Sequence, residues 1–311
     1  MADTQPPAAQ LFVPPTLTSH AASQSSLEGT LHGQDTQEKK ETEKNQTQPT
    51  TSPSSTPTTQ PTENFTRSGN AVWNHMTATI RPTLLAEAEL ILLTIFTGMQ
   101  DAVSFPDYHC FASNQTGNTV FLMLALVLPE LNGKMFVTAN IGAALGFFLA
   151  GGWLTGQLSH IIGPRCRLWL VACNFLQSGM VFAAGAIQYV YGIDLEGSRA
   201  IAVIGLLAFA SGSQVVQSRS LAMTEISTAM ATAAWVDLLI DPKLFAICNR
   251  PRTRRVVFLF ALVVGALLGA AIYRTVGSSV AILVSAGGKL LVAFMYLFNE
   301  AEKPKVEEST V

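Results

Sequence analysis

Charged residues are scarce in this chain. They make up 13% of its 311 residues, whereas a soluble globular protein carries about 25%. Hydrophobic residues make up 49%, and the mean hydropathy is +0.33. The net charge of −2 argues against binding to nucleic acid through bulk electrostatics. The composition therefore favours a membrane protein with membrane lipid as a partner and without nucleic acid.

Cysteine is also rare, and no two cysteines form a CxxC pair. The four cysteines are Cys110, Cys166, Cys173 and Cys248. No His lies near them at ligand spacing, so we expect buried or interfacial thiols and neither a disulfide framework nor a metal site. The sequence lacks a nucleophile elbow, a P-loop, a GxGxxG turn and an HExxH helix in a suitable context. It therefore predicts no cofactor, no metal and no catalytic residue.

The first part of the chain lacks apolar clusters. Residues 1–80 are rich in Ser, Thr, Gln and Pro, and such a segment buries too little apolar surface to offset the entropy of ordering. We expect a disordered cytoplasmic tail there and a short charged tail at 301–311. No basic n-region followed by an apolar h-region begins the chain, so the first spanning helix is expected to act as an internal signal anchor.

Almost all of the hydrophobicity lies between these tails, at residues 81–300. A spanning helix needs about 20 mostly apolar residues, and the sequence predicts an all-α transmembrane bundle of six to eight spans. The candidate segments are Leu84–Ser104, Gly117–Leu128, Phe136–Leu158, Leu168–Tyr189, Ala200–Gln217, Ile226–Ile240, Val256–Tyr273 and Val280–Phe298. The second and sixth are short, and full spans, half-helices and re-entrant segments stay open for them.

The bundle contains a predicted internal repeat at an offset of 114 residues. Its halves are about 84–190 and 199–298, with four helical segments each. The positions that match are Gly98 with Gly212, Gln100 with Gln214, Ser104 with Ser218, Gly151 with Gly265 and Gly163 with Gly277. If every segment crosses, each half has an even number of crossings, and the repeat is parallel with its axis along the membrane normal. Asp101 falls on Val215, so an acidic site would belong to the first half only.

Lys and Arg residues in short loops indicate the orientation. With eight crossings, the side of the N-terminus carries most of the basic residues, including the run Arg250–Arg255. The opposite side carries Arg165, Arg167, Arg219 and Arg274. This asymmetry predicts that both termini are cytoplasmic, and it leaves open which membrane holds the protein.

Polar residues interrupt the apolar pattern between Thr97 and Phe121. Lipid tolerates irregular polar backbone only beside protein or water, and an acidic residue within a span is a functional candidate because its burial is costly. We therefore predict that Asp101 binds a proton or a solute, with Gln100, Asn118 and Gln214 as polar partners. The alternative is a capped interfacial loop in which Thr116 or Asn118 caps the next helix.

Several glycines recur at positions where helices either break or pack closely. They are Gly98, Gly117, Gly212, Gly265 and Gly269. Small residues at four-residue spacing let helix backbones approach closely in lipid. We expect the pair at the ends of the predicted polar breaks, Gly98 and Gly212, to face each other near the repeat axis.

Three stretches resemble a known family. They are Gly98–Phe105, which reads Gly-x-x-Asp-Ala-x-Ser-Phe, the Thr116–Asn118 turn, and Ala208–Gln214, which reads Ala-Phe-Ala-Ser-Gly-x-Gln. The chain from about Leu84 to Phe298 is similar to the YoaK-like multi-spanning membrane proteins, domain of unknown function 1275. The resemblance implies a membrane helix bundle, and it supplies no activity and no catalytic residues.

The leading functional hypothesis is a transporter or permease-like protein for a small solute, because repeats, polar interruptions and missing catalytic motifs are typical of transporters. An integral membrane enzyme or an accessory protein of a biosynthetic pathway is the alternative, as is a membrane scaffold. A homo-oligomer is compatible with the sequence. The solute is not identifiable from the residues.

Overall fold

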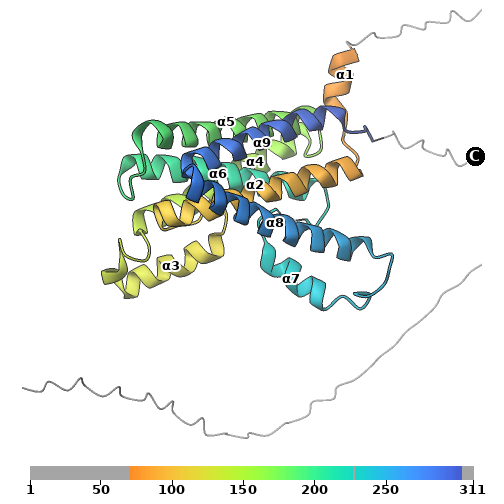
Figure 1. Ribbon diagram of the computed structural model, residues 1–311. Coiled ribbons are helices and arrows are strands. Elements are labelled where there is room, and N and C mark those ends of the chain that lie inside the picture. Colours follow the sequence, from red (N-terminus) through yellow and green to blue (C-terminus); the bar gives the residue numbers. More distant parts are fainter. Residues whose placement is uncertain (1–70, 227, 303–311) are drawn as a thin grey trace, which may run out of the picture. The chain divides into compact units, whose positions relative to one another are not determined.

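The computed structural model describes residues 71–226 and 228–302, and Figure 1 shows that helices dominate this part of the chain. Six helices are long and apolar enough to cross a membrane. They are α2 (Leu84–Tyr108), α4 (Thr138–Ile162), α5 (Arg167–Tyr191), α6 (Ser198–Ser220), α8 (Arg250–Thr275) and α9 (Ser278–Met295). The described residues thus form a multi-pass membrane helix bundle, as predicted, with six spans.

The second and sixth predicted segments are short helices, α3 (Gln115–Val127) and α7 (Ala231–Leu239). At about 1.5 Å per residue they extend for roughly 20 and 14 Å, less than the core thickness of about 30 Å. Neither is long enough to cross. Of the alternatives left open for these segments, the full span is therefore wrong.

Helical structure is present within the last residues of the predicted N-terminal tail. Helix α1 (Ala71–Thr77) and the buried Ile80 lie within the segment that we predicted to be disordered. Ile80 donates its backbone N–H to the Arg165 carbonyl at 2.9 Å. Most of the predicted tail, residues 1–70, and nearly all of the C-terminal tail lie outside the described residues.

The helices pack as two equivalent sets of four, with α2–α5 in the first half and α6–α9 in the second. Helix α2 packs on α8 as α6 packs on α4, and α2 packs on α9 as α6 packs on α5. Helix α3 contacts α4 as α7 contacts α8. Exchanging the two halves therefore maps each contact onto another one, which is the arrangement expected for a two-fold internal repeat.

The two halves run in opposite directions. Helix α9 is antiparallel to both α2 and α5, and α6 is antiparallel to α5. The residue pairs that establish this are Glu89 with Asn299, Gln100 with Ser285, Ser178 with Ala286, Gln188 with Ser278, Gln177 with Ser213 and Leu170 with Gln217. Helices α2 and α6, which are repeat equivalents, therefore point in opposite directions. The predicted parallel sense is wrong, because α3 and α7 leave each half with three crossings and an odd number inverts the repeat.

Glycines set the closest approaches between the halves. Gly98 of α2 lies against the Leu262 carbonyl of α8, and its repeat equivalent Gly212 of α6 lies against the Phe148 carbonyl of α4. Leu262 and Phe148 are themselves 114 positions apart, so the contact is repeated. Both glycines lie inside continuous helices. They are packing positions and do not break the helices, and each faces a helix of the other half and not the other glycine.

The other predicted packing glycines behave in two ways. Gly265 and Gly269 of α8 lie against the carbonyls of Ile95 and Met99 on α2, where a Cβ would collide with the backbone. Gly117 lies in the first turn of α3 beside the Phe111 ring. The first two hold α2 and α8 together, while Gly117 fits the start of the short helix.

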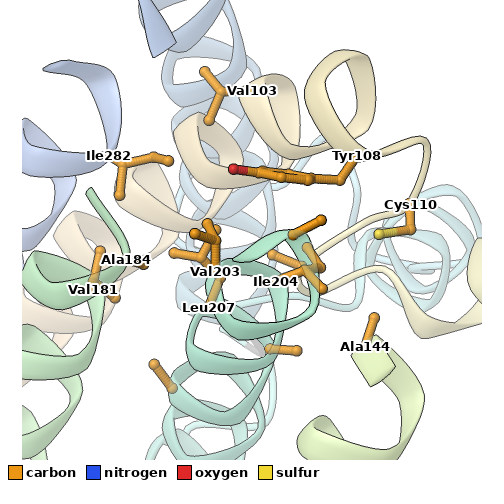
Figure 2. Packing of buried hydrophobic residues seen from close by; sticks show 14 of the residues in the cluster. Val103, Tyr108, Cys110, Ala144, Val181, Ala184, Val203, Ile204, Leu207 and Ile282 are labelled. Atoms are coloured by element: carbon orange, nitrogen blue, oxygen red, sulfur yellow. The ribbon is translucent and has the colours of Figure 1, made fainter. Parts of the chain in front are cut away.

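An apolar cluster lies where α2, α5, α6 and α9 meet (Figure 2). Tyr108 and Cys110, at and just after the end of α2, join Ile204 and Leu207 of α6 and Ile282 of α9. Large apolar side chains are also exposed on the outer faces, such as Leu149 of α4 and Phe260 and Leu267 of α8. Apolar surface on both sides of these helices is what a bundle surrounded by lipid requires.

Candidate functional site

The site begins where the chain turns back after α2. His109 ends the helix in a left-handed conformation at φ 52°. The next residues fold back along α2, so that Ser113 reaches Asp101, about two turns before the helix end. Asn114 then caps α3 by accepting the Gly117 N–H at 3.3 Å. Helix α3 therefore starts beside Asp101, within the bundle, and its cap is Asn114, not Thr116 or Asn118.

Asp101 closes this turn with both carboxylate oxygens. Oδ1 accepts the Ser113 backbone N–H at 2.8 Å, and Oδ2 accepts the Ser113 hydroxyl at 2.5 Å. The side chain is partly exposed. Charge-assisted hydrogen bonds of this kind are the strong ones. The carboxylate therefore orders the turn while one face stays accessible.

That accessible face looks into a cavity of about 700 Å³. Its walls come from α2, the first turns of α3 and α7, and one residue each from α4, α6 and α8. The wall residues form repeat-equivalent pairs: Asp101 with Val215, Gln115 with Ala229, Thr116 with Met230, Gly117 with Ala231, and Phe148 with Leu262. The cavity therefore lies across the repeat axis, and Asp101 is its single ionisable residue among those described.

The remaining predicted partners do not join Asp101 at the cavity. Asn118 is fully buried behind the turn, where it accepts the Phe111 N–H at 2.9 Å and donates to the Phe111 carbonyl at 2.8 Å. Gln100 donates to Ser285 of α9 at 3.0 Å. Asn118 and Asp101 thus support the same turn, whereas Gln100 lies at another interface.

Gln214 leads to a residue that sequence reasoning missed. Its amide nitrogen donates to the Thr97 hydroxyl at 2.8 Å, and its Oε1 accepts from Lys289 Nζ. Lys289 lies in the middle of α9 and is fully buried. The signal was present, because a lysine within an apolar span is costly and is a functional candidate by default. Asp101 was predicted on that ground, and Lys289 meets it equally.

Fold and site together define an integral membrane protein of two inverted three-span repeats, with two short helices that start beside a shared cavity. The chain belongs to the family described as protein of unknown function DUF1275, whose model matches residues 90–295. The predicted resemblance is therefore confirmed. Comparisons with curated proteins and with solved structures found no match.

Proposed function

We propose that the protein is a transporter or permease-like protein that binds a small solute in the cavity beside Asp101. The observation that supports this most directly is the position of the cavity across the axis that relates the two inverted halves. Inverted repeats with a central site at the repeat interface are typical of secondary transporters. Rocking of one half against the other would expose such a site to each side in turn.

The cavity limits what kind of solute fits. Its volume of about 700 Å³ is within the range of about 300–1,000 Å³ of small-molecule sites. Phe121, Phe148 and Leu262 supply apolar walls, while Gln115 and Thr116 supply hydrogen-bonding groups. The Asp101 carboxylate favours a solute with a cationic or hydrogen-donating group, or a proton that accompanies the solute.

We further propose that both termini face the cytoplasm. With six spans, Lys134, Arg199 and Arg274 fall on the side opposite the termini. The described basic residues on the side of the termini are Arg81, Arg165, Arg167, Arg219, Lys243, Arg250, Arg252, Arg254 and Arg255. Relative to the eight-span assignment, Arg165, Arg167 and Arg219 move to the side of the termini, and Lys134 and Arg199 move to the opposite side. The asymmetry of basic residues is larger in the six-span topology, which favours this orientation.

Cysteine accessibility tests the orientation. The exposed Cys248 lies between α7 and α8, so a membrane-impermeant maleimide should modify it only after the cytoplasmic side is opened. In a variant without the native cysteines, Lys134→Cys should react with the same reagent in intact cells. Labelling of Cys248 in intact cells would reverse the assignment.

Metabolite profiling tests the function itself. Cells with and without the gene are compared inside and outside by untargeted mass spectrometry, and a transporter should leave a solute chemically unchanged but redistributed. Asp101→Asn should abolish the redistribution, and Thr232→Trp should do so by filling the cavity. Leu239→Trp is the matched control, because Leu239 lies on the same helix α7 with 72% of its surface exposed and does not line the cavity.

The outcomes separate the competing functions. A product that disappears from both compartments would favour an enzyme or an accessory protein of a pathway. Redistribution that persists in Asp101→Asn and in Thr232→Trp, with the protein present in the membrane, would refute the cavity as the solute site.

A further inference from the structure

A second polar feature lies between α2 and α9, away from the cavity walls. It consists of seven side chains, here called the α2–α9 ladder. Its members are Glu89, Thr97, Gln100 and Asp107 of α2 and Ser278, Ser285 and Lys289 of α9. Each has at most 3% of its surface exposed. Polar groups therefore occupy a helix interface at which apolar residues would pack at lower cost.

The ladder extends over the length of the bundle. Glu89 and Asp107 are 18 positions apart, which corresponds to about 27 Å along a helix, close to the core thickness of about 30 Å. Polar contacts occur at successive levels between them. Asn299 donates to Glu89 at 2.6 Å at one end, and Gln188 of α5 donates to Asp107 at 2.7 Å and to Ser278 at the other.

The middle of the ladder holds a lysine without an acidic partner. Lys289 Nζ donates to Gln214, which donates to Thr97, and no ion pair of Lys289 is found within the described residues. One turn earlier in α9, Ser285 accepts from Gln100. A buried cation with only an amide oxygen as partner is expensive to retain for structure alone.

The carboxylates at the two ends keep unused hydrogen-bonding capacity. Glu89 Oε2 and Asp107 Oδ1 are buried and have no hydrogen-bond partner in the part of the chain that the structure describes. Tyr296 Oη, at the end of α9 that pairs with Glu89, is also unpartnered there. Atoms of this kind are uncommon in native interiors and call for an explanation.

We propose that the α2–α9 ladder conducts protons across the bundle, with Lys289 as the exchanging group at its centre. Lys289 lies at the level of Thr97, about 12 and 15 Å along α2 from Glu89 and Asp107, so water entering between the levels of the ladder carries the proton. A proton leaves the Lys289 ammonium group, which becomes a neutral amine, and passes through this water to the carboxylate of Asp107 or Glu89, which becomes a carboxylic acid. The amine then takes up a proton from the opposite end. No bond other than those to the moving proton changes, and nothing is oxidised or reduced.

The titratable groups around the ladder come from few elements. Helix α2 contributes Glu89, Asp107 and the buried Tyr108 beside Asp107, and α9 contributes Tyr296. The remaining neighbours are Cys173 of α5, near Tyr296, and Tyr273 of α8, which faces Asp107. Helix α6 presents the uncharged Gln214 to Lys289. No group of the cavity wall is needed, so the proposal goes beyond solute transport and does not depend on it.

Proton flux into liposomes tests the proposal. The purified full-length protein is reconstituted with pyranine trapped inside, and a potassium gradient with valinomycin drives protons inward without any solute present. The wild type should acidify the lumen at least tenfold faster than protein-free liposomes, and Lys289→Met should remove at least nine-tenths of that flux. Lys134→Met, which removes an exposed lysine, should leave it unchanged.

The absence of flux in the wild type, or full flux in Lys289→Met, overturns the proposal. If Lys289→Met fails to fold, as judged by size-exclusion chromatography and circular dichroism, Asp107→Asn and Glu89→Gln decide the question. Unchanged proton flux in both variants would show that the α2–α9 ladder does not conduct protons. Because the assay contains no solute, a failure here leaves the cavity hypothesis standing, and a failure of solute transport leaves the flux result standing.

Discussion

The two halves of the molecule share their packing but differ in their chemistry. Gly151 and Gly265 occupy equivalent positions and lie against equivalent carbonyls, those of Phe209 and Ile95. At the cavity, in contrast, Asp101 of the first half faces an apolar counterpart, Val215. Backbone contacts between helices have kept the symmetry of the repeat, whereas the residues that could act on a solute have not.

The short helices show the same divergence. Helix α3 has 13 residues and follows a turn that Asp101 holds through Ser113. Helix α7 has 9 residues, and Val215, the equivalent of Asp101, offers no side-chain acceptor. A two-fold scaffold thus supports a one-sided polar site, and changes at equivalent positions should have similar effects on packing but different effects at the cavity.

The largest effect is expected at the glycine contacts. A Cβ at Gly151 or Gly265 would overlap a backbone carbonyl of the facing helix, and forced overpacking costs about 1–3 kcal/mol, at times more. Gly151→Ala and Gly265→Ala should therefore lower the thermal midpoint of the purified protein by several degrees, and by similar amounts. Gly142→Ala is the control, since no atom of a neighbouring element lies within 4 Å of the position that a Cβ would take there. A lower thermal midpoint in only one of the two variants would contradict the equivalence of the contacts.

A smaller effect is expected where the halves differ. Asp101→Val removes the acceptor of two Ser113 hydrogen bonds, and their loss should open the turn locally while the surrounding helices stay packed. The turn at 109–114 should then exchange its amide hydrogens faster, as measured by hydrogen–deuterium exchange. Val215→Ala, at the equivalent position, should leave exchange in residues 221–226 unchanged. Equal exchange in wild type and Asp101→Val would show that Asp101 does not hold the turn.

The repeat was predictable from the sequence because glycines at helix contacts keep the spacing of 114 residues, while other side chains of the two halves have diverged. The offset of 114 predicted from Gly98 and Gly212 reappears in the contacts of both residues. Whether the repeat is parallel or inverted was not predictable in the same way. It depends on whether α3 and α7 cross, and their apolar composition resembles that of a span although their lengths do not suffice.

The site was recovered in part. Asp101 was identifiable from the cost of a carboxylate within a span, and it does line a cavity. Its predicted partner Gln100 contacts α9 because consecutive helical residues point about 100° apart. Gln214 contacts Thr97, one turn of α2 before Asp101, and does not reach the carboxylate. Lys289 could have been found by the same cost argument, whereas its contact with Gln214 depends on how α6 and α9 both pack on α5.

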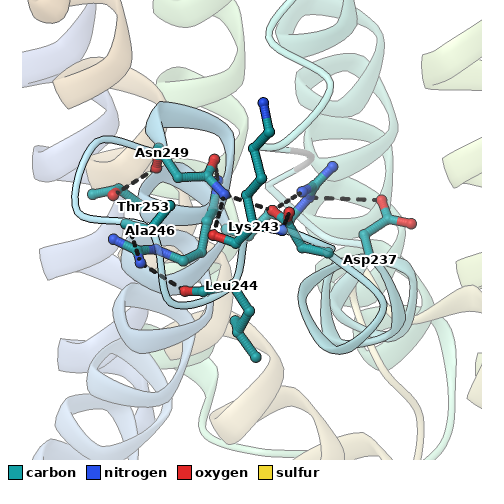
Figure 3. A network of polar contacts seen from close by, with 9 residues as sticks. Asp237, Lys243, Leu244, Ala246, Asn249 and Thr253 are labelled. Atoms are coloured by element: carbon teal, nitrogen blue, oxygen red, sulfur yellow. Dashed lines mark hydrogen bonds and ion pairs between the residues drawn. The ribbon is translucent and has the colours of Figure 1, made fainter.

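A modest effect is expected at the start of α8, which has a side-chain cap that its counterpart α4 lacks. Asn249 accepts the Arg252 N–H at 3.1 Å and donates to Asp241 at 2.9 Å (Figure 3). Loss of an N-cap costs about 1 kcal/mol, so Asn249→Ala should lower the thermal midpoint by a few degrees. Asn249→Ser keeps an uncharged acceptor at the helix start and should retain most of the stability. Equal thermal midpoints of Asn249→Ala and wild type would show that the Asn249 cap does not stabilise the protein.

The smallest effect concerns Asp241 in the same loop. The Lys243 backbone N–H donates to its carboxylate at 2.8 Å, and this bond, followed by the Asn249 amide and the Arg255 charge, lowers the pKa of Asp241. Because its folded pKa lies below the unfolded value of about 3.9, the stabilisation is present above that pH and is lost as the pH falls through the folded pKa. The difference in thermal midpoint between wild type and Asp241→Asn should therefore be small but measurable at about pH 6 and should shrink as the pH falls below about 4. Lys243→Ala keeps the backbone donor and should retain the wild-type pH profile, while a pH-independent difference for Asp241→Asn would show that ionisation of Asp241 does not stabilise the loop.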